Sequence, residues 1–125
     1  MSDANKEIEP ELCKVTDALG ILVGKWKPVI LLHLLGNGTQ RFNELKRSLP
    51  GITQKMLTNQ LRELEEEDII ERKVYAQVPP KVEYSVTDYG RSLEPILHAM
   101  HEWGSKHTLH KQAKKNEQEA EAEAK

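Results

Sequence analysis

The sequence predicts a mainly α-helical protein with a small β-hairpin, and three observations lead to this fold class. Apolar residues recur at helical spacing in five segments of the chain. Two short runs typical of strands, 69–76 and 81–86, are joined by Gln77-Val78-Pro79-Pro80, a hairpin tip where missing N–H donors do no harm. A short basic helix, a turn and an amphipathic helix precede this hairpin directly. Together they predict a winged helix-turn-helix over Gln40 to Thr87, with further helices on both sides.

The first two helices are expected over 12–23 and 26–35. The first carries apolar residues every three or four positions, and Gly24 ends it. Pro28 is tolerable in the first turn of the second helix, and Gly36-Asn37-Gly38 stops that helix.

The helix-turn-helix itself is expected to begin at 42 and to end in the acidic run 65–68. A third helix over 42–49 is followed by the turn Pro50-Gly51, and Thr53 suits the N-cap of a fourth helix. The acidic run 65–68 ends that helix. Its buried stripe is expected to consist of Met56, Leu57, Leu61 and Leu64.

A fifth helix is expected after the hairpin, with Thr87 as its cap and a kink near Arg91 caused by Pro95. The charged segment that follows either extends this helix or is disordered. The predicted organisation is a flexible leader at 1–11, one domain at 12–107 with its wing at 69–86, and a charged tail at 108–125.

Size and hydropathy favour a single domain inside the cell. The longest apolar run, 29–35, is far shorter than the roughly 20 residues of a membrane span. No secretory signal opens the chain. We therefore expect a cytoplasmic protein without a membrane partner.

The charge is unevenly distributed. The formal net charge is −2, but residues 1–11 and 116–125 hold eight of the 20 acidic residues and only two of the 18 basic ones. The body between them therefore carries about +4. Such a body is suited to a polyanion once the acidic ends move aside.

The fourth helix has the side chains needed to read double-stranded DNA in the major groove. Gln54 and Asn59 suit adenine, and Lys55 and Arg62 suit guanine or phosphate. A merely solvated face would not need basic residues before position 63 and acidic ones after it. The expected DNA-binding residues are Arg41, Lys46, Arg47, Thr53, Gln54, Lys55, Thr58, Asn59, Arg62, Lys73, Gln77 and Lys81.

The motifs together resemble the HxlR family of bacterial winged-helix transcriptional regulators. The resemblance covers about residues 12–107. It is carried by Cys13, Gly24-Lys25-Trp26, Arg41-Phe42-Asn43-Glu44-Leu45, Pro50-Gly51-Ile52-Thr53, Lys55-Met56-Leu57, Leu61-Arg62-Glu63-Leu64, Pro79-Pro80-Lys81-Val82-Glu83-Tyr84, Thr87 with Gly90, and Trp103-Gly104.

The resemblance implies a homodimer on a pseudo-palindromic operator, acting as a repressor or stress-responsive regulator. It also implies that the first and last helices form the interface. The apolar stripe of the fifth helix, wider than so small a domain covers alone, agrees with this. The expected interface residues are Leu12, Val15, Leu19, Leu93, Ile96, Leu97, Met100 and Trp103.

Cys13 is the candidate sensor of an oxidant or electrophile. A helix first turn and the adjacent Lys14 both lower a thiol pKa, and the resemblance implies sensing in some members. The alternative is a small buried residue that packs the helix start. The chain departs from the family in having Lys14 where proline is common, and it has one cysteine, so an internal two-thiol switch is excluded.

Other candidates favour ordinary structural roles. His98 and His101 have a metal-like spacing but lie off the apolar stripe, and His33 suits a core or interface position. Trp26, Tyr89 and Trp103 either line an effector pocket or belong to the core. No metal or other cofactor is expected.

No catalytic constellation is visible, so an enzyme is not expected. The rival to a DNA-binding regulator is a winged-helix module that uses the same helix to hold a protein partner.

Overall fold

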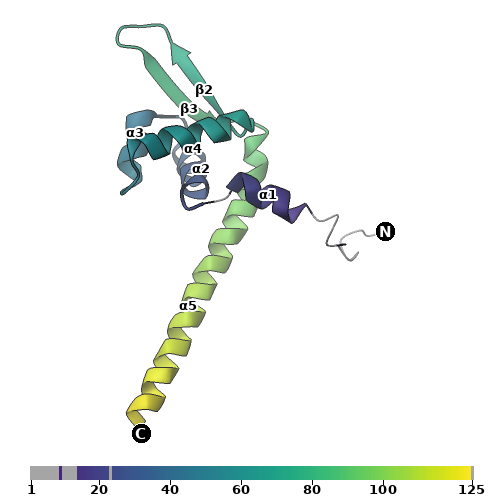
Figure 1. Ribbon diagram of the computed structural model, residues 1–125, viewed down its shortest axis with the longest axis vertical. Helices are drawn as coiled ribbons and strands as arrows, with labels where there is room; N and C mark the ends of the chain where they lie inside the picture. Colours follow the sequence, from purple (N-terminus) through teal and green to yellow (C-terminus); the bar gives the residue numbers. More distant parts are fainter. Residues whose placement is uncertain (1–8, 10–13, 23, 125) are drawn as a thin grey trace.

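The computed structural model describes residues 9, 14–22 and 24–124. The chain is mainly helical with a small antiparallel sheet, so the predicted winged helix-turn-helix is confirmed (Figure 1). Its elements are α1 (Val15–Leu22), α2 (Trp26–Asn37), β1 (Gln40–Arg41), α3 (Phe42–Ser48), α4 (Gln54–Glu66), β2 (Ile70–Tyr75), β3 (Lys81–Val86), the 3-10 helix η3 (Gly90–Leu93) and α5 (Glu94–Ala124).

One hydrophobic core joins α2, α3, α4, the sheet and the start of α5. The predicted stripe of α4 is buried at Leu57, Leu61 and Leu64, but Met56 is 37% exposed. Met56 lies about 100° round the helix from Leu57, which turns it away from the core. The remaining fully buried side chains are Ile30, Leu31, Leu45, Leu49, Ile70 and Leu97.

The sheet has three antiparallel strands in the order β1-β3-β2. The two wing strands lie within one residue of their predicted ends. Strand β1 was not predicted, because two residues are too few to show an alternating pattern. It pairs Gln40 with Tyr84 and Arg41 with Glu83, which ties the start of α3 to the wing.

The end of α4 is fixed by a left-handed residue. Asp68 has φ 61°, a conformation that a short polar side chain tolerates better than most. Its N–H donates to the Glu65 carbonyl, and the Ile69 N–H donates to the Leu64 carbonyl, both at 3.0 Å. These bonds satisfy two of the last carbonyls of α4 and lead the chain directly into β2.

Thr87 connects the end of α4 to the start of the last helices. Its hydroxyl donates to the Asp68 carbonyl oxygen at 2.6 Å and accepts from the Gly90 N–H at 2.8 Å. Its own N–H donates to the Ile69 carbonyl at 3.0 Å. The predicted capping role of Thr87 is therefore found, although the segment it caps is η3.

The last helix begins later than expected and is not kinked at Arg91. Arg91 lies in η3, and α5 starts at Glu94 with Pro95 as its second residue. Proline is accommodated there because a first-turn N–H needs no helical partner. The helix then runs through 31 residues, and its C-terminal part extends well away from the body (Figure 1).

Within the described ranges, no single helix has the length and hydropathy of a membrane span. Among these described residues, only α1 and α2 taken together have that length and hydropathy, and the two helices are bent by 78° relative to each other.

Replacing Gly90 by alanine should destabilise the protein. The added Cβ would lie 2.1 Å from the Ile69 carbonyl oxygen, so the Thr87 junction would have to open. We expect a loss of about 1–3 kcal/mol in the free energy of unfolding, measured by urea denaturation at fixed protein concentration.

Gly36→Ala is the matched control, because it is a helical glycine whose added Cβ meets nothing within 4 Å. That variant should be as stable as the original or slightly more so. Equal stability of the two variants would contradict the tight junction at Gly90.

Candidate nucleic-acid interface

Helix α4 presents a polar face to solvent. The side chains of Gln54, Lys55, Asn59 and Arg62 are all exposed, as the sequence predicted. They lie on one side of a helix whose other side is held in the core by three leucines. A rigid helix with forked and amide side chains on its free side is suited to base edges in a major groove.

The two threonines of this region have more restricted roles than the sequence indicated. Thr53 is the N-cap, and its hydroxyl oxygen accepts from the Met56 N–H at 3.1 Å, leaving its hydrogen free to donate. Thr58 donates its hydroxyl hydrogen to the Gln54 carbonyl at 2.8 Å. Thr58 therefore offers an acceptor and a methyl group, which suit a thymine methyl better than a phosphate.

Helix α4 is held against α2 by an ion pair. Lys27 Nζ lies 2.9 Å from Glu63 Oε1, and the Lys27 side chain is only 7% exposed. The Glu63 carboxylate is half exposed, so the pair lies at the edge of the core. A buried ammonium needs this partner, because leaving it unpaired costs more than the bond itself contributes. Sequence reasoning did not identify this pair.

Helix α3 places basic residues beside α4. Lys46 and Arg47 are exposed in its last turn, and Arg41 precedes its first residue. The Arg41 N–H donates to Glu44 Oε1 at 2.8 Å, which caps the helix start. Arg41 and Arg47 line one shallow hollow with Asn43 and Glu44. This surface is suited to phosphates that flank a groove.

The outer face of the wing carries its own neutralising charge. Lys73 and Lys81 lie over the Tyr75 ring at 5.4 and 5.0 Å from its centroid. Lys81 also lies 3.4 Å from the Glu83 carboxylate. The Tyr75 hydroxyl and the Lys81 ammonium hold the pKa of Glu83 below its ordinary value. Lys81 is thus partly compensated by Glu83, whereas Lys73 contacts the Tyr75 ring, and Gln77 lies at the exposed tip.

The structure adds Arg72 to the candidate residues. It lies on the wing face that turns toward α4, opposite to that of Lys73. The sequence could have indicated this orientation of Arg72. Side chains alternate between the two faces of a strand, so Arg72 lies on the same face as the buried Ile70.

An apolar stripe remains exposed on α5 and α1. Ile96, Met100 and Trp103 are exposed on α5, and Val15 and Leu19 are exposed on α1. Ile96, Ala99, Met100 and Trp103 line one apolar hollow of about 490 Å³.

One residue expected at the dimer interface is buried in the core. Leu97 is 2% exposed, whereas Leu93 is half-buried and packs against the edge of the core. Leu12 lies outside the described residues, as does Cys13.

The aromatic residues considered for an effector pocket do not enclose one. Trp26 packs on the core, while Tyr89 and Trp103 are largely exposed. Trp103 instead stacks on His107 with a ring separation of 4.9 Å.

The histidines show no grouping suited to a metal in the described part of the chain, where three or more potential ligands never come together. His98 lies 3.7 Å from the Glu94 carboxylate, and His33 is half-buried on α2.

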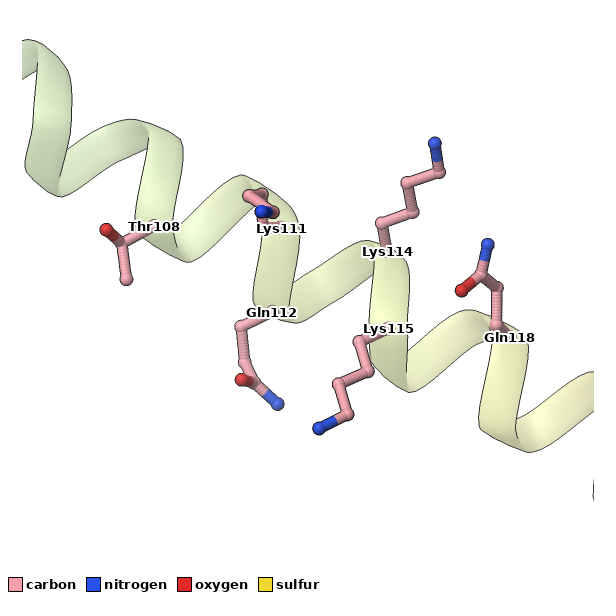
Figure 2. A pocket seen from close by; sticks show the side chains of 6 residues that line it. All are labelled: Thr108, Lys111, Gln112, Lys114, Lys115 and Gln118. Atoms are coloured by element: carbon pink, nitrogen blue, oxygen red, sulfur yellow. The ribbon is translucent and has the colours of Figure 1, made fainter.

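The C-terminal part of α5 provides a surface and no enclosed cavity. A hollow of about 620 Å³ is bounded by Thr108, Lys111, Gln112, Lys114, Lys115 and Gln118. Figure 2 shows Lys114 and Gln118 pointing to one side of the helix and Gln112 and Lys115 to the other. A single helix therefore forms its only wall, and nothing opposes it among the described residues.

The helix-turn-helix, the exposed face of α4 and the wing define a DNA-binding protein of the winged helix-turn-helix class. The HxlR-like helix-turn-helix family model matches residues 21–112. The chain therefore belongs to this family of transcriptional regulators, and it is not an enzyme.

Individual relatives agree with this assignment. The chain is 55% identical over 97 residues to YdeP of Bacillus subtilis (strain 168), an uncharacterized HTH-type transcriptional regulator, covering 78% of this chain and 75% of YdeP. It resembles the redox regulator HypR in its reduced form with a TM-score of 0.72 and 53% identity, over 75% of this chain and 92% of HypR. It also resembles the reduced form of the regulator YodB from B. subtilis, with a TM-score of 0.66 and 34% identity, over 80% and 94% of the two chains.

Proposed function

We propose that the protein is a homodimeric, sequence-specific transcriptional regulator that inserts α4 into the major groove of a pseudo-palindromic operator. The observation that carries this proposal is the free face of α4, where Gln54, Lys55, Asn59 and Arg62 are exposed together. The basic side chains of α3 lie beside this face and would contact flanking phosphates. The protein then acts as a repressor or a stress-responsive regulator.

The exposed apolar stripe supports the homodimer. A contiguous apolar patch that one protomer leaves uncovered marks an interface. Ile96, Met100 and Trp103 on α5, with Val15 and Leu19 on α1, would pack against the same residues of a second copy. Two copies of α4 held in this way would meet half-sites about 34 Å apart on one face of the DNA.

We also propose that Cys13 senses an oxidant or electrophile. The neighbouring Lys14 and the expected helix start favour the thiolate. HypR, which is 53% identical to this chain, is described as a redox regulator. Oxidation to a sulfenic acid, a mixed disulfide or a Cys13–Cys13′ bridge across the dimer would change the geometry of the two DNA-reading helices.

The second candidate is an interaction module that holds a protein on α4. The division of charge along α4, basic up to Arg62 and acidic from Glu63, favours DNA. Salt dependence distinguishes the two, because DNA contact predicts a steep loss of affinity from 50 to 200 mM salt. A flat response would overturn the DNA-binding proposal.

Asn59→Ala should relax sequence preference. If Asn59 pairs with a base, its loss reduces discrimination at that position by roughly 1–3 kcal/mol, whereas Lys46→Ala weakens binding to all sequences alike. Both are measured by titrating labelled duplexes selected from a random library and unselected duplexes of equal length. A uniform loss in both variants would show that α4 does not read bases.

Trp103→Glu should convert the dimer into monomers, because it places a carboxylate within the apolar stripe. Sedimentation velocity measures this over a range of concentrations. Leu109→Glu is the matched control: Leu109 is 71% exposed and lies six residues further on, about 240° round the helix axis. Dimers that survive Trp103→Glu but dissociate with Leu109→Glu would place the interface on the other face.

Cys13→Ser should keep DNA affinity and lose any response to diamide or hydrogen peroxide. The chain has one cysteine, so no second thiol can substitute. DNA titrations before and after oxidant treatment measure the effect. A response that persists in the serine variant would exclude the thiol.

A further inference from the structure

A polar hollow lies between α4 and the wing. It measures about 330 Å³ and is lined by Thr58, Arg62, Glu65, Arg72 and Tyr84. Three of these residues come from α4, and the other two come from β2 and β3. The hollow therefore opens where the DNA-reading helix and the wing meet.

Strand register explains why Arg72 faces this hollow. Arg72 pairs with Tyr84, and Tyr84 pairs with Gln40, so these three residues share one face of the sheet. Ile70 and Val86 lie on the same face and are buried. The neighbouring Arg72 side chain extends from this buried face at the point where the sheet emerges beside α4.

The two arginines of the hollow form no ion pair with the described residues. Neither Arg62 nor Arg72 has a carboxylate within 4 Å in the described part of the chain, although Glu65 lines the same hollow. Lys27 and Lys81, in contrast, each have an ion-pair partner. Two guanidinium groups thus line one space with a single carboxylate, Glu65, that forms an ion pair with neither of them.

A phosphate group would supply the hydrogen-bond acceptors and the negative charge that the two arginines can bind. Guanidinium presents its N–H groups as a planar fork that matches two phosphate oxygens, and two forks can share one phosphate. The Thr58 hydroxyl hydrogen is already donated to the Gln54 carbonyl, so the donors that face the hollow are mainly the two arginines.

We propose that Arg72 is a DNA-binding residue, and that Arg62 and Arg72 together hold one backbone phosphate in this hollow in each half-site. The inference rests on the proposed insertion of α4 into the major groove, since the strand bordering that groove would then pass between α4 and the wing. The contact sets how deeply α4 enters the groove and reads no base itself.

The first test compares Arg72→Gln with the unaltered protein on a duplex selected from a random library and on unselected duplexes. Arg72→Gln should weaken binding about tenfold on both and reduce the slope of log affinity against log salt by about one. Arg91→Gln is the control, because Arg91 is an exposed arginine in η3, outside the helix-turn-helix and the wing. Equal affinity and slope for Arg72→Gln and the unaltered protein would overturn the inference.

The second test locates the phosphate. Each backbone phosphate of the selected duplex is replaced in turn by an uncharged methylphosphonate. One position per half-site should weaken the unaltered protein most, weaken Arg72→Gln and Arg62→Gln less, and have no further effect on the double variant. The double variant should lose less than the two single losses combined. The loss of affinity caused by Arg72→Gln could instead simply add to the loss caused by each methylphosphonate, at every position alike. Arg72 would then act only through long-range electrostatic attraction, and the inference would be overturned.

Free inorganic phosphate is the alternative ligand for the two arginines. Inorganic phosphate is added to the DNA-free protein at constant ionic strength, and the thermal midpoint is followed. Stabilisation that disappears in Arg72→Gln, while DNA affinity stays unchanged, would assign the hollow to a small anion and overturn the DNA contact. If the unaltered protein bound no duplex at all, the proposed function would fail, and this inference with it.

Discussion

The Thr87 hydroxyl is the point on which the arrangement of the molecule depends. It bonds to the end of α4 through the Asp68 carbonyl and to the start of η3 through the Gly90 N–H. The absence of a Cβ at Gly90 lets these backbones approach. One side chain therefore fixes the reading helix, the base of the wing and the first turn before α5 as a single unit.

The basic side chains considered above are of two kinds, those paired with a carboxylate and those without such a partner. Lys27 and Lys81 are paired with Glu63 and Glu83, and the first of these pairs joins α2 to α4. Arg62 and Arg72 have no such partner among the described residues and face the space between α4 and the wing. The Lys27–Glu63 pair positions α4, and the two arginines are available to a polyanion.

The periodic elements could be predicted from the sequence, because apolar spacing and turn residues act locally. The N-cap at Thr53, the α4 stripe at Leu57 and the wing strands follow from such patterns. The pair Lys27–Glu63 and the two-residue strand β1 could not be predicted, since they depend on segments brought together only by folding. Leu97 was misplaced for the same reason: its spacing shows an apolar face but not which neighbour covers it.

The length of α5 has a mechanical consequence. At 1.5 Å per residue, its 31 residues span about 46 Å. The helix starts directly beyond the Thr87 junction, so its base moves together with the wing and α4. A tilt of 10° would displace its far end by about 8 Å relative to the body, by the same rise per residue. In the proposed dimer, a modest shift between the two α5 helices would likewise change the separation of the two copies of α4 without unfolding either one.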